Sequence, residues 1–231
     1  MKLKELLSSF APGFDATPLA EKFRSAASVM AGILLLGWML HFLFPGTGYV
    51  GPSLLSSMAA AALLVYAVPH SPMAQPWPLV MGNLISGVVG VACALLLPDT
   101  LWAVSCGAGL SVLAMHLTRS LHPPGAATAL FMVLNAPVFQ QHGWFWSAGV
   151  VLANVMLTLL LALIINNLLH RGRYPVRRHH APVKSATGTT LTEADVEWAL
   201  QQMEGVTDVS EEDLLEIFRL ACEHAQKQKM S

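Results

Sequence analysis

The chain has 231 residues, of which 54% are hydrophobic and only 12% are charged, and its formal net charge is −1. Soluble domains carry roughly a quarter charged residues, so this composition excludes an ordinary soluble domain and indicates a membrane protein. No basic surface for nucleic acid is visible. The three cysteines lack metal-site or disulfide spacing. We therefore expect no metal, no cofactor and no nucleic-acid partner.

Charged residues flank a long apolar block, which defines the predicted domains. Residues 1–24 form an N-terminal segment without the apolar core of a signal peptide. Residues 25–170 form the transmembrane domain, in which Asp99 and Arg119 alone carry a formal charge. Residues 171–190 read as a basic and then polar linker. Residues 191–231 read as a C-terminal helical hairpin, because two capped amphipathic segments follow each other there.

Apolar runs of membrane-spanning length, about 17 to 25 residues, predict helices over 25–44, 51–68, 79–97 and 144–169. The run over 101–117 is slightly short, and the run over 123–139 is short and interrupted by prolines. The expected fold is all-α, a polytopic membrane protein with about six transmembrane or half-spanning helices. Two alternatives fit the segments 51–68 and 123–139, which either cross the membrane or re-enter it.

Basic residues before the first run and after the last predict that both termini lie in the cytoplasm, in a cytoplasmic (inner) membrane. An even number of crossings follows. Six crossings place Arg119 toward the cytoplasm, and four place it outside; the positive-inside tendency prefers six. The alternative for Arg119 is that it marks the cytoplasmic edge of the bilayer by snorkelling.

A faint internal repeat accompanies these runs. Pro52 and Pro124 each open a run of small residues, and Asn83 and Asn154 follow them at nearly the same distance. Three helices per half would make the repeats inverted, and in transporters of that kind the site lies where interrupted helices of both halves meet. Similar composition of small-residue helices is the competing explanation.

The polar residues concentrate in the stretch LTRSLHPPGAATAL, residues 117–130. This stretch closely resembles the signature of the HPP family of integral membrane proteins. The residues PHSP at 69–72, AQP at 74–76 and GN at 82–83 resemble an upstream part of that family. The resemblance covers about residues 25–169 and implies a multi-spanning membrane protein. Some members are described as nitrite transporters, so the resemblance also implies a small-anion substrate.

The residues themselves also point to an anion. A helix that starts at two prolines and a glycine offers free amides and a partial positive charge, and Arg119 adds donors that match two coplanar oxygens. Serine hydroxyls behind Pro52 would supply a second half-site. The predicted substrate-binding set is Arg119, His122, Pro123, Pro124, Gly125, Ala126, Ala127, Thr128, Ser53, Ser56 and Ser57. Candidates for a pore or proton relay are His116, Asn83 and Asn154.

Each role has a structural alternative. His122 could simply cap a turn, His116 could be a packed neutral side chain, and the asparagines could hydrogen-bond between helices. We expect no enzyme, because the sequence contains no nucleophile or metal motif. The predicted function is a transporter or channel for a small monovalent oxyanion, with nitrite first. The alternative is a non-transporting scaffold or sensor that signals through the C-terminal helices, which in either case predict a homo-oligomer.

Overall fold

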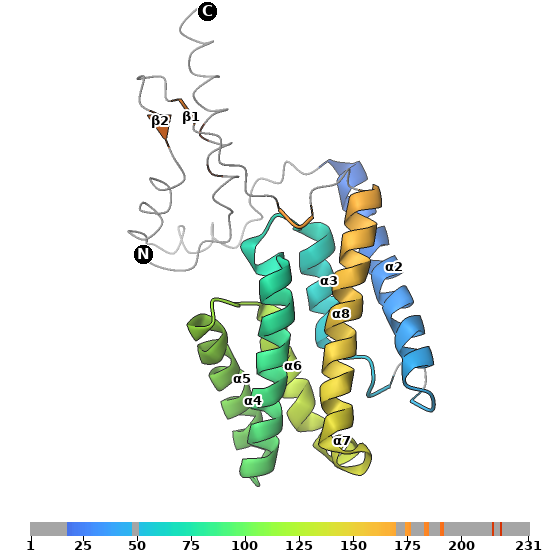
Figure 1. Ribbon diagram of the computed structural model, residues 1–231, viewed down its shortest axis with the longest axis vertical. Helices are drawn as coiled ribbons and strands as arrows, with labels where there is room; N and C mark the ends of the chain where they lie inside the picture. Colours follow the sequence, from blue (N-terminus) through green and yellow to red (C-terminus); the bar gives the residue numbers. More distant parts are fainter. Residues whose placement is uncertain are drawn as a thin grey trace, which may run out of the picture.

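The computed structural model describes residues 18–47, 51–169, 174–176, 183–184, 190–191, 214 and 218. Its main body is a bundle of α-helices (Figure 1). In chain order the elements are α2 (Leu19–Leu43), α3 (Ser57–Ala67), the 3₁₀ turn η1 (Pro72–Ala74), the π-turn η2 (Pro78–Gly82), α4 (Asn83–Leu96), α5 (Thr100–Leu117), α6 (Pro123–Leu134), α7 (Ala136–His142) and α8 (Trp144–Leu169).

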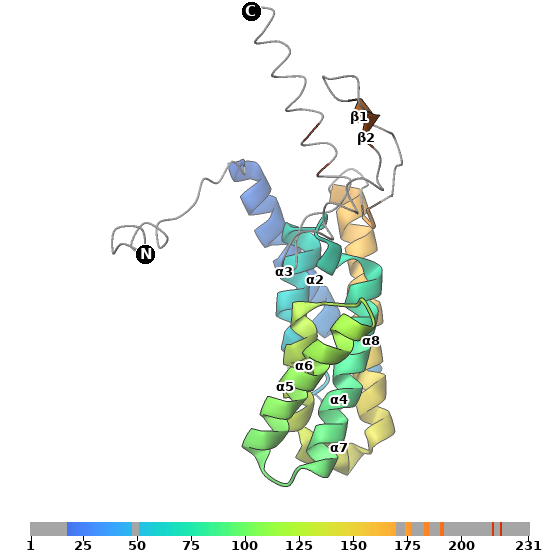
Figure 2. The ribbon, with the colours of Figure 1, turned by 90° about the vertical axis from the view of Figure 1, so that its left-hand side faces the viewer.

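Four helical stretches are long and apolar enough to cross a membrane: α2, η2 with α4, α5, and α8. The helices α3 and α6 are apolar but shorter. Figures 1 and 2 show α2, α4 and α6 running one way along the bundle and α3, α5 and α8 running the other way. As a result, α2 begins and α8 ends at the same end of the bundle. The prediction of an all-helical membrane domain is confirmed.

The predicted helix over 51–68 needs a correction, because α3 begins only at Ser57 and the preceding residues form turns. Pro52 has no N–H to donate. In addition, the Asn154 side chain of α8 hydrogen-bonds to backbone groups that would otherwise bond within a helix. It donates to the Ser53 carbonyl oxygen at 2.7 Å and accepts from the Leu55 N–H at 3.2 Å. These bonds to α8 hold the segment in a non-helical form.

Other boundaries also differ from the prediction. The first helix begins at Leu19, earlier than Ser25, because Glu21 and Arg24 pair with each other along its first turns. The linker contains a short antiparallel strand pair, β1 (Val183–Lys184) with β2 (Thr190–Leu191). The predicted hairpin over 191–231 lies outside the described residues, except for Leu191, Leu214 and Phe218.

Small residues on α4 bring it very close to α6. A Cβ added at Gly90 would lie 2.5 Å from the Ala129 carbonyl oxygen of α6. Just before α4, a Cβ added at Gly82 of η2 would lie 2.7 Å from the Ser120 carbonyl oxygen, in the turn between α5 and α6. Backbone atoms cannot retreat as a flexible side chain could. Only glycine therefore permits this approach, which is the usual role of small residues between membrane helices.

The remaining helix contacts fall into matching pairs. Helix α2 packs on α3 and α8, α5 packs on α6 and α4, and α3 packs on α8 as α6 packs on α4. The two short helices also contact each other. Large apolar side chains are exposed along the outer faces of the long helices, for example Leu34, Val88, Leu101 and Leu160. Such faces suit lipid contact.

Candidate functional site

A buried chain of polar side chains joins α3, α6 and α4. The Ser57 and Thr128 hydroxyl oxygens are 2.7 Å apart, and the Thr128 hydroxyl donates to the Asn83 Oδ1 atom at 2.6 Å. All three side chains have an exposed fraction of 2% or less. Ser57 is the first residue of α3, so this chain, which we call the polar cluster, lies where α3 begins against α6.

The direction of each hydrogen bond in the polar cluster follows from donor counting. The Asn83 amide nitrogen donates to the Leu79 carbonyl oxygen at 2.8 Å, which turns the Asn83 oxygen toward Thr128. Thr128 has one hydroxyl proton, which it gives to Asn83 and more weakly to the Pro124 carbonyl oxygen at 3.3 Å. Ser57 must therefore donate to Thr128. Every hydroxyl proton of the cluster is in use.

Asn154 forms a second buried polar contact between the halves of the chain. Besides its bonds to the segment before α3, its amide nitrogen donates to the Val150 carbonyl oxygen at 2.8 Å. Asn83 on α4 thus holds α6, and Asn154 on α8 holds the start of α3. Asn83 therefore connects two helices, as the structural alternative expected, and Asn154 connects α8 to the turns that precede α3.

His122 precedes α6 and is completely buried. Its Nδ1 atom lies 2.8 Å from the Met73 carbonyl oxygen, and a carbonyl only accepts, so Nδ1 carries the proton. The Nε2 atom has no partner among the described residues. The His122 carbonyl oxygen accepts the Gly125 N–H at 2.7 Å. One amide expected to be free for an anion is therefore bound within the turn.

Arg119 and His116 lie apart from the polar cluster, on the exposed surface near the end of α5. Arg119 adopts a positive φ of 51°, an uncommon conformation for a residue with a side chain. The Trp77 indole N–H donates to the neighbouring Thr118 carbonyl oxygen at 3.3 Å, and Trp77 is itself exposed. An exposed tryptophan beside an exposed arginine is typical of the membrane–water interface.

The structure thus brings together part of the predicted set. Buried members are Ser53, Ser57, Asn83, His122, Pro124, Gly125, Thr128 and Asn154. Partly buried members are Ala126 and Ala127, and exposed members are Ser56, His116, Arg119 and Pro123. Within the described part of the chain, no group of three His, Cys, Asp or Glu side chains could hold a metal ion.

Sequence reasoning did not identify three residues that contact the His122 region. Met73 provides the carbonyl for His122, while Gln75 and Tyr174 hold the same turn from other sides. Gln75 belongs to a stretch noticed only for its family resemblance, and nothing local distinguishes Tyr174. Its partner lies 100 residues earlier in the chain, so no pattern in sequence could reveal it.

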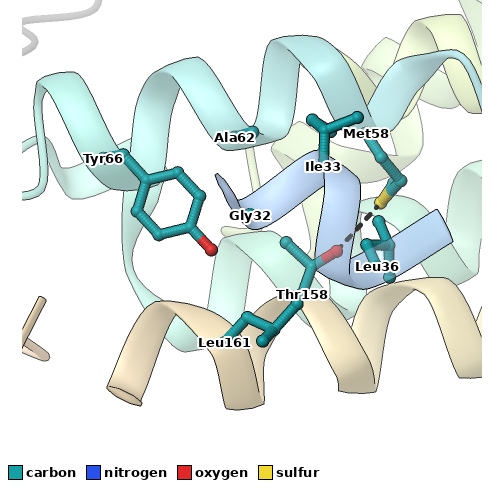
Figure 3. Close-up of a pocket in the computed structure, with 8 residues that line it drawn as sticks. All are labelled: Gly32, Ile33, Leu36, Met58, Ala62, Tyr66, Thr158 and Leu161. Atoms are coloured by element: carbon teal, nitrogen blue, oxygen red, sulfur yellow. Dashed lines mark hydrogen bonds between the residues drawn. The ribbon is translucent and has the colours of Figure 1, made fainter. Parts of the chain in front are cut away.

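A narrow crevice, with no room for a water molecule, lies between α2, α3 and α8 (Figure 3). Figure 3 shows the Tyr66 ring and Thr158 facing it, with the Thr158 hydroxyl 3.5 Å from the Met58 sulfur. The rest of the lining is apolar, from residues such as Leu36 and Leu161. The crevice offers a small ion no charge and no amide, so we do not assign the site there.

The profile of the HPP transmembrane region matches residues 15–175 of the chain. Over 128 residues, 53% of this chain and 40% of the relative, the chain is 42% identical to a transmembrane protein of Dictyostelium discoideum. A second transmembrane protein of that organism is 38% identical over 127 residues, 53% of this chain and 44% of the relative. The chain therefore spans less than half the length of these relatives. No solved structure matches it. The match over most of its length shows that the chain belongs to the HPP family of transmembrane proteins.

Proposed function

We propose that this HPP-family protein provides a membrane pathway for a small monovalent oxyanion, with nitrite as the first substrate to test. The polar cluster is the observation that carries this proposal, because hydrogen-bonded side chains are buried where the two short helices α3 and α6 meet within the bundle. Polar groups at membrane depth are costly and mark substrate pathways. Interrupted helices that meet near the bilayer midplane are a common transport-site arrangement.

The chemistry of the surrounding groups favours an anion. Near the start of α6, the Ser57 and Thr128 hydroxyls can donate to an anion once their internal bonds are released, and no carboxylate of the described residues is buried there. Hydroxyls of Ser57 and Thr128 can turn toward an anion, and Arg119 adds a charge at the entrance of the turn. Such a lining binds weakly and reversibly, which passage requires.

Passage requires these groups to exchange partners. The Gly125 N–H is bound to the His122 carbonyl oxygen, and the hydroxyls are bound to one another, so an incoming anion must replace these internal bonds. Relative motion of α3 and α6 would release them. Both a rocking carrier and a gated pore can work in this way.

A three-plus-three inverted repeat accounts for the matching helix contacts. For these six helices, exchanging α2 with α5, α3 with α6 and α4 with α8 converts each observed contact pair into itself or into another observed pair. The bonds of Asn83 to α6 and of Asn154 to the start of α3 follow the same exchange. From the basic residues that flank the spans, we further propose that both termini lie in the cytoplasm and that the protein resides in the cytoplasmic membrane. Self-association through the C-terminal segment stays a prediction.

The test is uptake of nitrite into proteoliposomes that contain the purified full chain, with nitrate, formate and chloride as competitors. Thr128→Val removes the central hydroxyl and should lower uptake strongly, whereas Thr128→Ser should retain it. Thr158→Val is the matched control outside the polar cluster. Equal uptake by the Thr128→Val and Thr158→Val proteins would show that the polar cluster is not part of the pathway. Absence of flux for every anion with folded protein would favour the scaffold or sensor.

A further inference from the structure

Three consecutive residues of the loop between α3 and α4 each hold a different part of the protein. The Met73 carbonyl oxygen accepts from His122, the Ala74 carbonyl oxygen accepts from the Tyr174 hydroxyl at 2.8 Å, and the Gln75 Oε1 atom accepts from the Val176 N–H at 3.0 Å. One short turn therefore contacts both the start of α6 and the segment that follows α8.

The segment after α8, residues 174–176, is firmly held against this turn. Tyr174 is buried, with an exposed fraction of 3%. Its carbonyl oxygen also accepts from the Asn167 amide at 2.8 Å, which ties it back to α8. Burial, and secondarily the Tyr66 hydroxyl, raise the pKa of the Tyr174 phenol. The phenol therefore keeps its proton near neutral pH and remains a donor.

The Gln75 side chain keeps the turn in shape. Its amide nitrogen donates to the Pro69 carbonyl oxygen at 2.9 Å and to the Ser71 carbonyl oxygen at 3.0 Å. The Gln75 side-chain oxygen accepts from the Val176 N–H, so both the nitrogen and the oxygen of the amide are hydrogen-bonded. A shift of Val176 must therefore either break this bond or move the turn.

His122 transmits such a movement to the start of α6. It is bound to the turn through Nδ1, and its own carbonyl oxygen holds the Gly125 N–H. It has little freedom to adjust alone, since a Cβ at Gly82 would lie 2.7 Å from the His122 Cβ atom. A displaced Met73 carbonyl must thus either lose its donor or move His122 with it.

We propose that residues 174–176 position the His-Pro-Pro turn through η1, so that changes in the chain after α8 alter the opening of the start of α6. Tyr174 is then a positioning residue, and the C-terminal part of the protein regulates the pathway. The effect on transport rests on the proposed function, but the coupling itself does not.

Hydrogen–deuterium exchange of the full-length protein in lipid nanodiscs tests the coupling directly. Tyr174→Phe keeps the ring and removes the hydroxyl, which leaves the Ala74 carbonyl without its donor. We expect exchange at the amides of Gly125 to Thr128 to rise roughly tenfold, the effect of losing one well-placed buried hydrogen bond. Thr158→Val, which removes a hydroxyl whose contact among the described residues is the Met58 sulfur, should leave these amides unchanged.

A double variant separates positioning from a general loss of stability. In a His122→Ala background the link to Met73 is absent, so adding Tyr174→Phe should change exchange at Gly125 to Thr128 less than twofold. Val176→Pro removes the donor to Gln75 at a partly buried position and serves as an independent second variant. Val176→Pro should raise the exchange rates at Gly125 to Thr128 when His122 is present, and should leave them unchanged in the His122→Ala background.

The outcomes distinguish the coupling from the proposed function. Faster exchange at the start of α6 that depends on His122 supports the coupling even if no anion flux is found. Unchanged exchange at Gly125 to Thr128, with or without faster exchange at η1, would overturn it even if nitrite uptake is robust. Equal increases with and without His122 would also overturn it, because they would reflect general destabilisation.

Discussion

Replacing Thr128 by valine tests whether the polar cluster holds the two short helices together. Valine has nearly the same shape, so the substitution creates no cavity and removes only the hydroxyl. That hydroxyl accepts from Ser57 at 2.7 Å and donates to Asn83 at 2.6 Å. Both partners are buried and no water can replace the lost bonds without a rearrangement.

The expected loss follows from counting these bonds. Hydrogen bonds between membrane helices average about 0.6 kcal/mol and reach about 1.7 kcal/mol. A buried group left without a partner costs about 1–3 kcal/mol. Two such bonds are lost, so we expect Thr128→Val to lower the free energy of unfolding by about 1–3 kcal/mol.

Reversible unfolding by sodium dodecyl sulfate in mixed micelles, followed by circular dichroism, measures this loss. Thr158→Val is the matched control, because the Thr158 hydroxyl reaches only the Met58 sulfur among the described residues, at 3.5 Å. It should cost clearly less than Thr128→Val, because it removes one weak contact to sulfur and not two short hydrogen bonds. Ser57→Ala should add little once Thr128 is valine, since the shared bond is already gone. A loss for Thr128→Val no larger than the control would refute the account of the polar cluster.

Three further predictions concern helix packing, the start of α3 and Arg119. Gly90→Ala should lower stability by about 1–3 kcal/mol because its Cβ would meet backbone, whereas Gly109→Ala, with nothing within 4 Å, should be neutral or stabilising; thermal denaturation of both compares them. Asn154→Val removes the bonds to the segment before α3 and should increase deuterium exchange at the Leu55 amide, and protection equal to wild type would argue against this anchor. Arg119→Ala should leave the melting temperature unchanged and reduce nitrite uptake, and Arg119→Lys should restore it poorly. Arg119→Gly should be more stable than Arg119→Ala by about 1 kcal/mol, because glycine accepts the positive φ; equal melting temperatures would contradict that.

The long helices were predictable because the length of an uninterrupted apolar run is enough to identify a membrane-spanning helix. The spans at α2, α5 and α8 agree with the apolar runs, apart from their ends. The family assignment was also accessible, since the stretch 117–130 carries a dense and unusual pattern that the match over residues 15–175 confirms. These features depend on residues close together in the chain.

The length of α3 was not predictable in the same way. Residues 53–56 are apolar or small and fit a helix, but Asn154, about 100 residues later, hydrogen-bonds to the Ser53 and Leu55 backbone groups. Likewise, Thr128, Ser57 and Asn83 were candidates on sequence grounds, but only the fold places Ser57 and Asn83 beside Thr128. Long-range hydrogen bonds decided these details, and sequence periodicity contains no signal for them.

The initial rate of nitrite uptake into proteoliposomes, measured against rising external nitrite, tests the central claim most directly. The proposed pathway predicts a rate that saturates, exceeds that of protein-free vesicles and falls in the Arg119→Ala and Thr128→Val proteins while Thr158→Val stays near wild type. A rate indistinguishable from protein-free vesicles, with correctly folded wild-type protein, would contradict it.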